Sequence, residues 1–359
     1  MRLCLYVHED NQTCETLQPA EPLLAEAAFD IIQTKKIDQA KELLDVLCGP
    51  SISKGDRGEF ICTLLWLLAR DDVVLKNRSP TGYGKARSVI KVVDLMKALL
   101  AQKWHSAVMD AEPSCLKDQT DKSSFQNLFK DAVAYFTQFI KVQDFQVINR
   151  AYLWMALARG AAILCANNQG GLDILIPFEY HDELLAKKHV SAIIIQVKND
   201  ATYGAKPHRV LFHLMNPYRI GFYDTDEEET VPVIRMVFAL AATDSNVHVM
   251  APPERQQPPR KASTKSKAPR FTSFDIWCAK ASKETFSGVQ SDDTFVKLLS
   301  TQKKFPESYK SNILDEELLR RQMHPMALAK EEHWLFGKPF TRKNRNNDLD
   351  WDDDELLDD

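Results

Sequence analysis

Two apolar stretches decide the fold of this chain: GGLDILIPFEY at residues 170–180 and SAIIIQVKND at residues 191–200. The second is rich in β-branched residues, and both stretches predict buried β-strands. Asp173 opens the first apolar run, whereas Gln196 and Lys198 lie two residues apart at the end of the second. A purely structural core has no need of charged and amide groups at its strand ends, so these three residues are candidates for a function.

The spacing of these residues determines which of them can meet. Side chains two residues apart on a strand share a face, so Gln196 and Lys198 point the same way while Ile195 and Val197 point to the other side. Asp173 lies at the start of the neighbouring strand, and its carboxylate converges with the pair if the two strands are paired. The pattern therefore predicts a carboxylate, an amide and an ammonium group gathered at an edge of the sheet.

Such a group of side chains suits a hard divalent cation. Mg²⁺ prefers oxygen ligands and keeps several waters, so the Asp173 carboxylate, the Gln196 amide oxygen and the main-chain carbonyl of Val197 would hold it weakly. The Lys198 ammonium would then orient or deprotonate a water, or stabilise charge on a phosphate. A structural ion pair between Asp173 and Lys198 is the alternative interpretation.

Further apolar runs predict the rest of a sheet after Gly160. The sequence NNQGG is typical of a tight turn between two strands. Because the runs are continuous rather than alternating, we expect strands that are covered on both faces by helices. The additional predicted strands are residues 161–166, 209–216 and 231–241.

Helical spacing dominates the chain before this point. The predicted helices cover residues 22–48 as one or two helices, 55–72, 85–104, 123–141 and 144–159. We expect Asp56 to cap the helix at 55–72. The fold class that follows is α/β (α+β), with a mixed sheet flanked by helices and a large helical region at residues 1–143.

The C-terminal third of the chain changes composition. We expect a core at residues 144–250, a basic flexible linker at 251–270, an extension at 271–340 and an acidic disordered tail at 341–359. The linker has six basic residues against one Glu, which suits a nuclear-import signal, a nucleic-acid contact or a solvated spacer. The tail carries eight acids and no base over residues 348–359, with Trp351 and two Leu among them. This composition suits docking into a basic groove, either the chain's own or that of a basic protein.

Composition restricts the class of protein and its compartment. A hydrophobic fraction of 44% with a charged fraction of 27% is typical of a soluble globular protein. The seven Cys are odd in number and lack a CxxC pair, which favours reduced thiols. No segment has the roughly 20 apolar residues of a membrane span, and the N-terminal apolar run is short for a signal peptide. We therefore expect no membrane partner and an intracellular location, nuclear or cytoplasmic.

Asp173 followed by Gln196-Val197-Lys198 on the next apolar strand resembles the PD-(D/E)xK nuclease superfamily in its QxK variant. The likeness extends over about residues 145–242, and residues 55–72 and 158–177 also resemble uncharacterised fungal nuclease-like proteins. It implies a restriction-endonuclease-like core in the order helix, strand, strand with Asp, strand with QxK. It also implies metal binding by Asp173 and Gln196 and assistance to the attacking water by Lys198.

The superfamily often adds a Glu from its first core helix. Three acids are candidates here: Glu59, which ranks first, Asp144 at the start of the helix before the strands, and Glu179 shortly after the strand with Asp173. Gln196 in place of an acid removes one negative charge and should weaken the metal site. The expected function is therefore a Mg²⁺- or Mn²⁺-dependent nuclease acting on DNA or RNA. The alternative is a catalytically inactive nuclease-fold scaffold.

Overall fold

The computed structural model describes residues 3–7, 14–17, 21–47, 53–77, 89–117, 122–166, 169–180, 186–223, 230–252 and 271–300. All of them belong to one compact unit, Met1–Gln302, and a second unit, Lys303–Asp359, contains none of them. The predicted acidic tail and nearly all of the predicted basic linker therefore lie outside the described residues.

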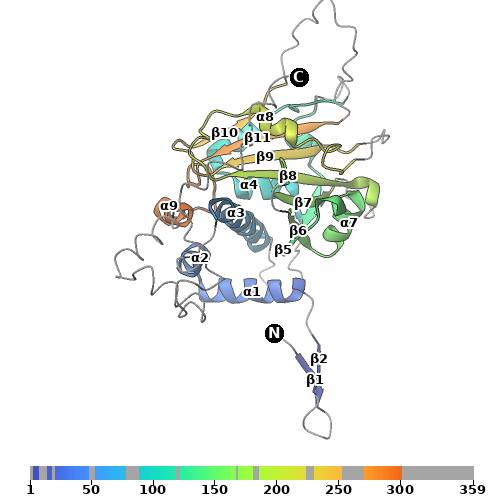
Figure 1. Cartoon of the computed structure of the whole chain (residues 1–359), viewed down its shortest axis with the longest axis vertical. Helices are drawn as coiled ribbons and strands as arrows, with labels where there is room; N and C mark the ends of the chain where they lie inside the picture. The colour runs from blue at the N-terminus through green and yellow to red at the C-terminus, as the bar shows by residue number, and fades with distance from the viewer. Residues whose placement is uncertain are drawn as a thin grey trace, which may run out of the picture. The chain divides into compact units, whose positions relative to one another are not determined.

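A nine-stranded mixed sheet forms the centre of the fold (Figure 1). Its strands run in the order β10-β11-β9-β8-β7-β4-β3, and β6 also pairs with β7 and β5 with β6. The strands are β3 Val89–Lys91, β4 Val133–Tyr135, β5 Gln138–Lys141, β6 Ala161–Leu164, β7 Ile174–Glu179, β8 Val190–Lys198, β9 Val233–Ala239, β10 Asn246–Val249 and β11 Ser273–Ala279. Strands β1 (Leu3–Val7) and β2 (Cys14–Leu17) form a separate antiparallel pair.

The two stretches that carry the candidate residues pair directly with each other. Strand β7 is antiparallel to β8, with Ile174 opposite Ile195 and Glu179 opposite Val190. Strand β8 is parallel to β9, and β9 is parallel to β11. The predicted strands around residues 161–166, 170–180, 191–200 and 231–241 are thus confirmed.

Helices cover both faces of the sheet, and each face has its own core. On the first face, Ile193 and Ile195 of β8 pack with apolar residues of α3 (Lys54–Lys76) and α4 (Val92–Leu99). On the second face, Ile194 packs with α7 (Arg150–Ala158) and α8 (Arg209–Leu214). The predicted fold class, an α/β (α+β) protein with a mixed sheet flanked by helices, is confirmed.

The remaining helices complete the two layers and the edges of the unit. They are α1 Glu21–Lys35, α2 Gln39–Leu47, η1 Gln102–Trp104, α5 His105–Met109, α6 Phe125–Leu128, η2 Phe145–Val147, η3 Lys187–His189 and α9 Asp292–Ser300. None of the helices in the described part of the chain combines the length and the apolar composition that a membrane crossing requires.

Helix α3 begins one turn before its predicted cap. Ser53 is the N-cap residue, and its Oγ accepts a hydrogen bond from the Asp56 backbone N–H at 3.1 Å. Asp56 lies in the first turn, where its negative charge suits the helix dipole. The prediction that Asp56 is the cap was wrong because a Ser three residues earlier already satisfies the Asp56 amide.

Residues 123–141 do not form the predicted helix. They form the short α6 and then β4 and β5, which pair with β3, β7 and β6. Residues 85–104 also differ, because 89–91 form β3 and only 92–99 continue as α4. In both segments the apolar residues fit a period of two as well as one of 3.6, and pairing with distant strands decides between them.

The sequence pattern predicts a strand at residues 209–216, but residues 209–214 form helix α8 instead. Helix α8 connects β8 to β9, and these two strands are parallel. A parallel pair needs a crossover that returns the chain to the same end of the sheet, and a helix usually makes it. Of the predicted helix at 144–159, residues 145–147 form η2 and α7 begins after the N-cap Asn149.

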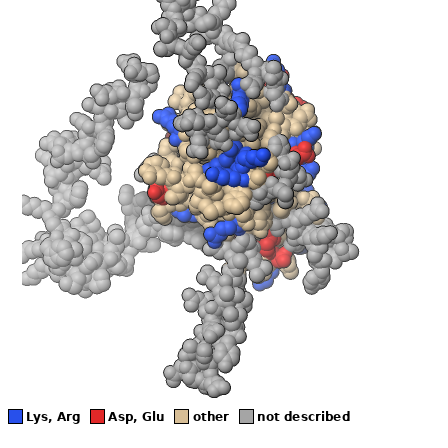
Figure 2. All heavy atoms as spheres, turned by 90° about the vertical axis from the view of Figure 1, so that its right-hand side faces the viewer, with Lys and Arg blue, Asp and Glu red and all other residues tan. Residues whose placement is uncertain are grey.

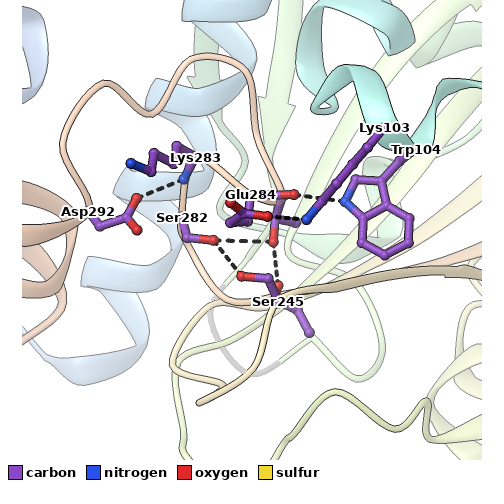
Figure 3. Close-up of polar contacts among 9 residues, drawn as sticks. Lys103, Trp104, Ser245, Ser282, Lys283, Glu284 and Asp292 are labelled. Atoms are coloured by element: carbon purple, nitrogen blue, oxygen red, sulfur yellow. Dashed lines mark hydrogen bonds and ion pairs between the residues drawn. The ribbon is translucent and has the colours of Figure 1, made fainter.

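The sheet extends beyond the predicted core segment 144–250. Strands β3, β4 and β5 precede this segment, and β11 follows it and lies between β9 and β10. The turn after β11 is anchored to other elements (Figure 3): Ser282 Oγ lies 2.7 Å from Ser245 Oγ, Lys103 pairs with Glu284, and Trp104 Nε1 donates to the Glu284 carbonyl at 2.8 Å. Residues up to 300 are therefore integral to the folded unit.

Candidate metal and phosphate site

The start of β7 and the end of β8 hold the predicted site together. Asp173 immediately precedes β7 and donates its backbone N–H to the Ile195 carbonyl at 2.9 Å, one residue out of the β7–β8 register, in which Ile174 is already opposite Ile195. The Asp173 carboxylate accepts a hydrogen bond from the Val197 backbone N–H, with 2.5 Å between Oδ2 and N. The carboxylate is thus fixed directly beside the predicted QxK sequence.

The Val197 carbonyl points toward the same side of β8 as its N–H. Successive residues of a strand present their N–H and C=O groups alternately to the two neighbouring strands. The Ile195 carbonyl accepts from Asp173, and the Lys198 carbonyl accepts from Leu240 beyond β9. By this alternation the Val197 carbonyl lies on the side of β8 that faces Asp173, as the prediction of a main-chain metal ligand at Val197 requires.

Gln196 and Lys198 project from the second face of the sheet. The alternation along β8 puts Ile194, Gln196 and Lys198 on that face, and Val197 packs against the core of the first face. Gln196 is only 4% exposed, and its Oε1 has no hydrogen-bond partner among the described residues. Such an atom costs free energy unless something satisfies it, so it favours a ligand at this position.

Helix α3 approaches the same strand end from the first face. A Cβ added to Gly58 would lie 2.9 Å from Asn199 Cβ and 3.1 Å from Val197 Cγ1, so only glycine permits this close packing. The Asn199 side-chain amide donates to the Lys54 carbonyl at 2.8 Å and ties the start of the helix to the end of β8. Glu59, the next residue after Gly58, is thereby held at the mouth of the predicted site.

The charges in this region act on one another. Burial, and next the nearby Asp173 carboxylate, raise the pKa of Glu59 to about 6, although the Lys141 ammonium opposes the change. Burial also raises the pKa of Asp173, against the Val197 N–H, Lys198 and Lys141, which all favour the charged form. The structure thus brings Asp173, Glu59 and Lys198 into one electrostatic cluster.

Lys141 is a member of this cluster that the sequence pattern did not reveal. It ends β5, and its Nζ lies 3.8 Å from Glu59 Oε2. Parallel pairing of β5 with β6 places Lys141 beside Leu164, at the level of Ile174. The sequence signal for Lys141 is a short strand that ends in Lys. The prediction of a helix at 123–141 left no strand there, so Lys141 was not recognised as a candidate.

The other two acidic candidates lie elsewhere. Asp144 is exposed at the start of η2, where its side chain accepts from the Gln146 N–H at 2.9 Å. Glu179 ends β7 at the opposite end from Asp173, and its Oε1 lies 3.4 Å from His189 Nδ1. Of the three candidates for an additional acid, the structure brings Glu59 alone next to Asp173.

The donor set fits a hard divalent cation of modest affinity. No group of three or more His, Cys, Asp or Glu side chains suited to a metal ion occurs among the described residues. Two interacting carboxylates are present, one of them bound to the Val197 N–H, and the unpartnered amide oxygen of Gln196 belongs to the preceding residue of β8. The carboxylates and the amide are oxygen donors, as Mg²⁺ or Mn²⁺ requires, and two nearby lysines limit the negative charge.

The structure thus defines a class: a mixed-sheet α/β protein with an acid–lysine cluster where two paired strands meet. Residues 1–209 match a family described as a domain of unknown function, DUF8736. This match covers more than half of the chain, so the protein belongs to that family, and it includes every residue of the cluster. No curated protein and no solved structure matches the chain.

Proposed function

We propose that this protein is a metal-dependent nuclease that hydrolyses phosphodiester bonds of DNA or RNA. The observation that carries the proposal is the electrostatic coupling of Asp173 to both Glu59 and Lys198 at the start of β7 and the end of β8. Carboxylates and an ammonium group at one point can hold a cation and a phosphate together.

The order of elements supports the same proposal. Helix α7 is followed by β6, by β7 with Asp173 at its start and by β8 with Gln196 and Lys198 at its end. A crossover helix then leads to the parallel strand β9. This is the order that the resemblance to PD-(D/E)xK nucleases implies, with the supporting acid supplied by α3 rather than by α7.

Each residue has a distinct proposed role. Asp173, Glu59, Gln196 and the Val197 carbonyl would hold Mg²⁺ or Mn²⁺ weakly, and the cation would supply positive charge to the scissile phosphate and acidify a water. Lys198 orients that water or stabilises charge on the phosphate. Its Nζ lies 5.6 Å from the centre of the Tyr203 ring, which restricts where the ammonium can go. Lys141 keeps the acid pair charged before the cation arrives.

Cleavage of plasmid and single-stranded substrates with Mg²⁺ or Mn²⁺ tests the proposal. We expect cleavage by the wild type and its loss in both Asp173→Ala and Lys198→Ala. Exposed Asp110 and Lys130 provide matched controls, because Asp110→Ala and Lys130→Ala remove the same charges from residues that do not act on the Asp173 or Glu59 carboxylate. Cleavage that survives in both site variants would contradict the assignment.

The charge balance favours one alternative, a nuclease-fold scaffold without catalysis. Gln196 replaces a third acid, and Lys141 and Lys198 offset the two carboxylates that remain. The scaffold predicts no cleavage with either metal on any substrate. It also predicts that Mn²⁺ does not raise the melting temperature, whereas the nuclease predicts a rise that Asp173→Ala abolishes.

Nucleic acid is the partner that follows from this function, with a nuclear or cytoplasmic location. We also propose that the acidic C-terminal residues 348–359 compete with nucleic acid for the Lys198 side of the site. Deletion of these residues should raise nucleic-acid affinity at low salt. An affinity that does not change would contradict the competition and leave the nuclease assignment untouched.

A further inference from the structure

A second polar cavity lies at the opposite end of β8. It has a volume of about 690 Å³ and lies between the start of α7, η3 and the turn at Gly221-Phe222. Strand β8 spans nine residues, and at about 3.3 Å per residue this places the cavity roughly 25–30 Å from Lys198. The cavity is therefore separate from the acid–lysine cluster.

The charged residues that line this cavity are Arg150, Lys187 and Lys188, and none of the described lining residues is acidic. Lys187 and Lys188 are exposed at the rim, whereas Arg150 is only 6% exposed. Figure 2 views the side of the molecule on which α7 lies in Figure 1, and it shows Lys and Arg side chains gathered in a compact group there. The described lining residues of the cavity thus carry three positive charges and no negative one.

The wall of the cavity is rigid. The Arg150 guanidinium carbon lies 5.2 Å from the centre of the Tyr223 ring and 6.0 Å from that of Phe222, so aromatic rings hold its plane. Gly221 adopts a φ of 79°, and a Cβ there would lie 3.1 Å from the Ile148 carbonyl oxygen. Only glycine therefore lets this turn pack against the residues that precede α7.

We propose that this cavity binds a phosphate group, either of a nucleotide or of a nucleic-acid backbone. Arg150 lines the cavity while its Nε donates to the Val190 carbonyl at 3.4 Å, so it contributes a fixed positive charge, and two lysines at the rim add charge without demanding a fixed direction. The volume lies within the range of small-molecule sites and accommodates a nucleotide. The assignment concerns other residues than the proposed nuclease site and does not depend on that function.

Inorganic phosphate tests the site directly. We expect phosphate to raise the melting temperature of the full-length protein in a saturable way, beyond chloride at equal ionic strength. In Lys187→Ala/Lys188→Ala the dissociation constant for phosphate should rise at least tenfold. The control Lys122→Ala/Lys130→Ala removes the same charge from exposed positions on either side of α6 and should bind phosphate as the wild type does.

Two further probes distinguish the sources of the phosphate, with Asp173→Asn as the background so that no probe is hydrolysed. If the source is nucleic acid, the double lysine variant weakens binding of a short single-stranded oligonucleotide and phosphate competes with it. If the source is a nucleotide, a nucleoside monophosphate competes with phosphate and oligonucleotide binding is unchanged. The proposal is overturned if phosphate gives no saturable stabilisation, or if the control pair weakens it as much as Lys187→Ala/Lys188→Ala.

Discussion

Two charged clusters interrupt the same sheet, and they differ in how far their polar atoms are satisfied. Between β9 and β11, Arg235 donates from Nε and Nη2 to the two oxygens of Asp275 at 2.7 and 2.6 Å, and from Nη1 to the Phe212 carbonyl. Asp275 also accepts from Ser273 Oγ at 2.9 Å. Both charged partners are buried, and each has a full set of neighbours.

In the cluster at the start of β7 and the end of β8, the polar groups are less completely satisfied. Burial raises the pKa of both Asp173 and Glu59, and Gln196 Oε1 has no partner among the described residues. A satisfied buried pair stabilises the fold, whereas two carboxylates whose charged forms are disfavoured by burial and an amide oxygen without a partner cost stability, and a bound ligand would compensate that cost. The Arg235–Asp275 pair therefore stabilises the sheet, and the Asp173 cluster is the one that the proposed function requires.

Breaking the satisfied cluster should have the largest effect. Asp275→Ala leaves Arg235 buried without its carboxylate, and we expect a loss of about 3–5 kcal/mol of unfolding free energy. Urea denaturation followed by circular dichroism measures it. A loss below about 1 kcal/mol would mean that the pair contributes little, and the contrast between the clusters would fail.

Neutralising the unsatisfied cluster should affect activity and not stability. We expect Asp173→Asn to lower the cleavage rate by about 100-fold or more. The same variant should melt at the same temperature as the wild type or higher, because burial already disfavours the charged form of Asp173. Reduced stability together with full activity would reverse the roles of the two clusters.

The close approach of α3 to β8 should be sensitive to a single methyl group. Gly58→Ala places a Cβ 2.9 Å from Asn199 Cβ and should cost about 1–2 kcal/mol as the helix moves away. Glu59 would then lose part of its burial, and its pKa should fall from about 6 toward 4.5 in a titration followed by NMR. Gly55→Ala is the matched control, since its Cβ would meet only Ser53 Oγ, at 3.8 Å.

Glu59→Gln should give the smallest effect, visible only as a pH dependence. The pKa of Glu59 is higher in the folded protein than its ordinary value of 4.5, so the wild type loses stability as the pH rises from 4.5 to about 6. Glu59→Gln removes that loss, and we expect it to be more stable than the wild type by about 1 kcal/mol at pH 8 and equal to it at pH 4. Thermal melts across this range measure the difference, and identical profiles would show that Glu59 is not perturbed.

Added Mn²⁺ provides a further test of the stability difference between Glu59→Gln and the wild type. At pH 8 the cation should raise the melting temperature of the wild type and reduce or reverse the advantage of Glu59→Gln. Asp275→Ala should respond to Mn²⁺ as the wild type does, because Asp275 lies in the other cluster.

Local sequence patterns were enough to predict the centre of the sheet and three residues of the cluster. Strands β7 and β8 are continuous apolar runs, and a period of two assigns Gln196 and Lys198 to one face without any tertiary information. The position of Asp173 beside them depended on one further condition, that consecutive strands pair, which short connections favour.

The other members of the cluster and the connection between β8 and β9 depend on contacts between distant segments. Lys141 enters the cluster because β5 pairs with β6, and Glu59 enters because Gly58 packs against β8 from the other face. Residues 209–214 are helical because β8 and β9 are parallel and need a crossover. Local patterns predict which face a residue occupies, but contacts between distant segments determine which faces meet, and no short window of sequence contains them.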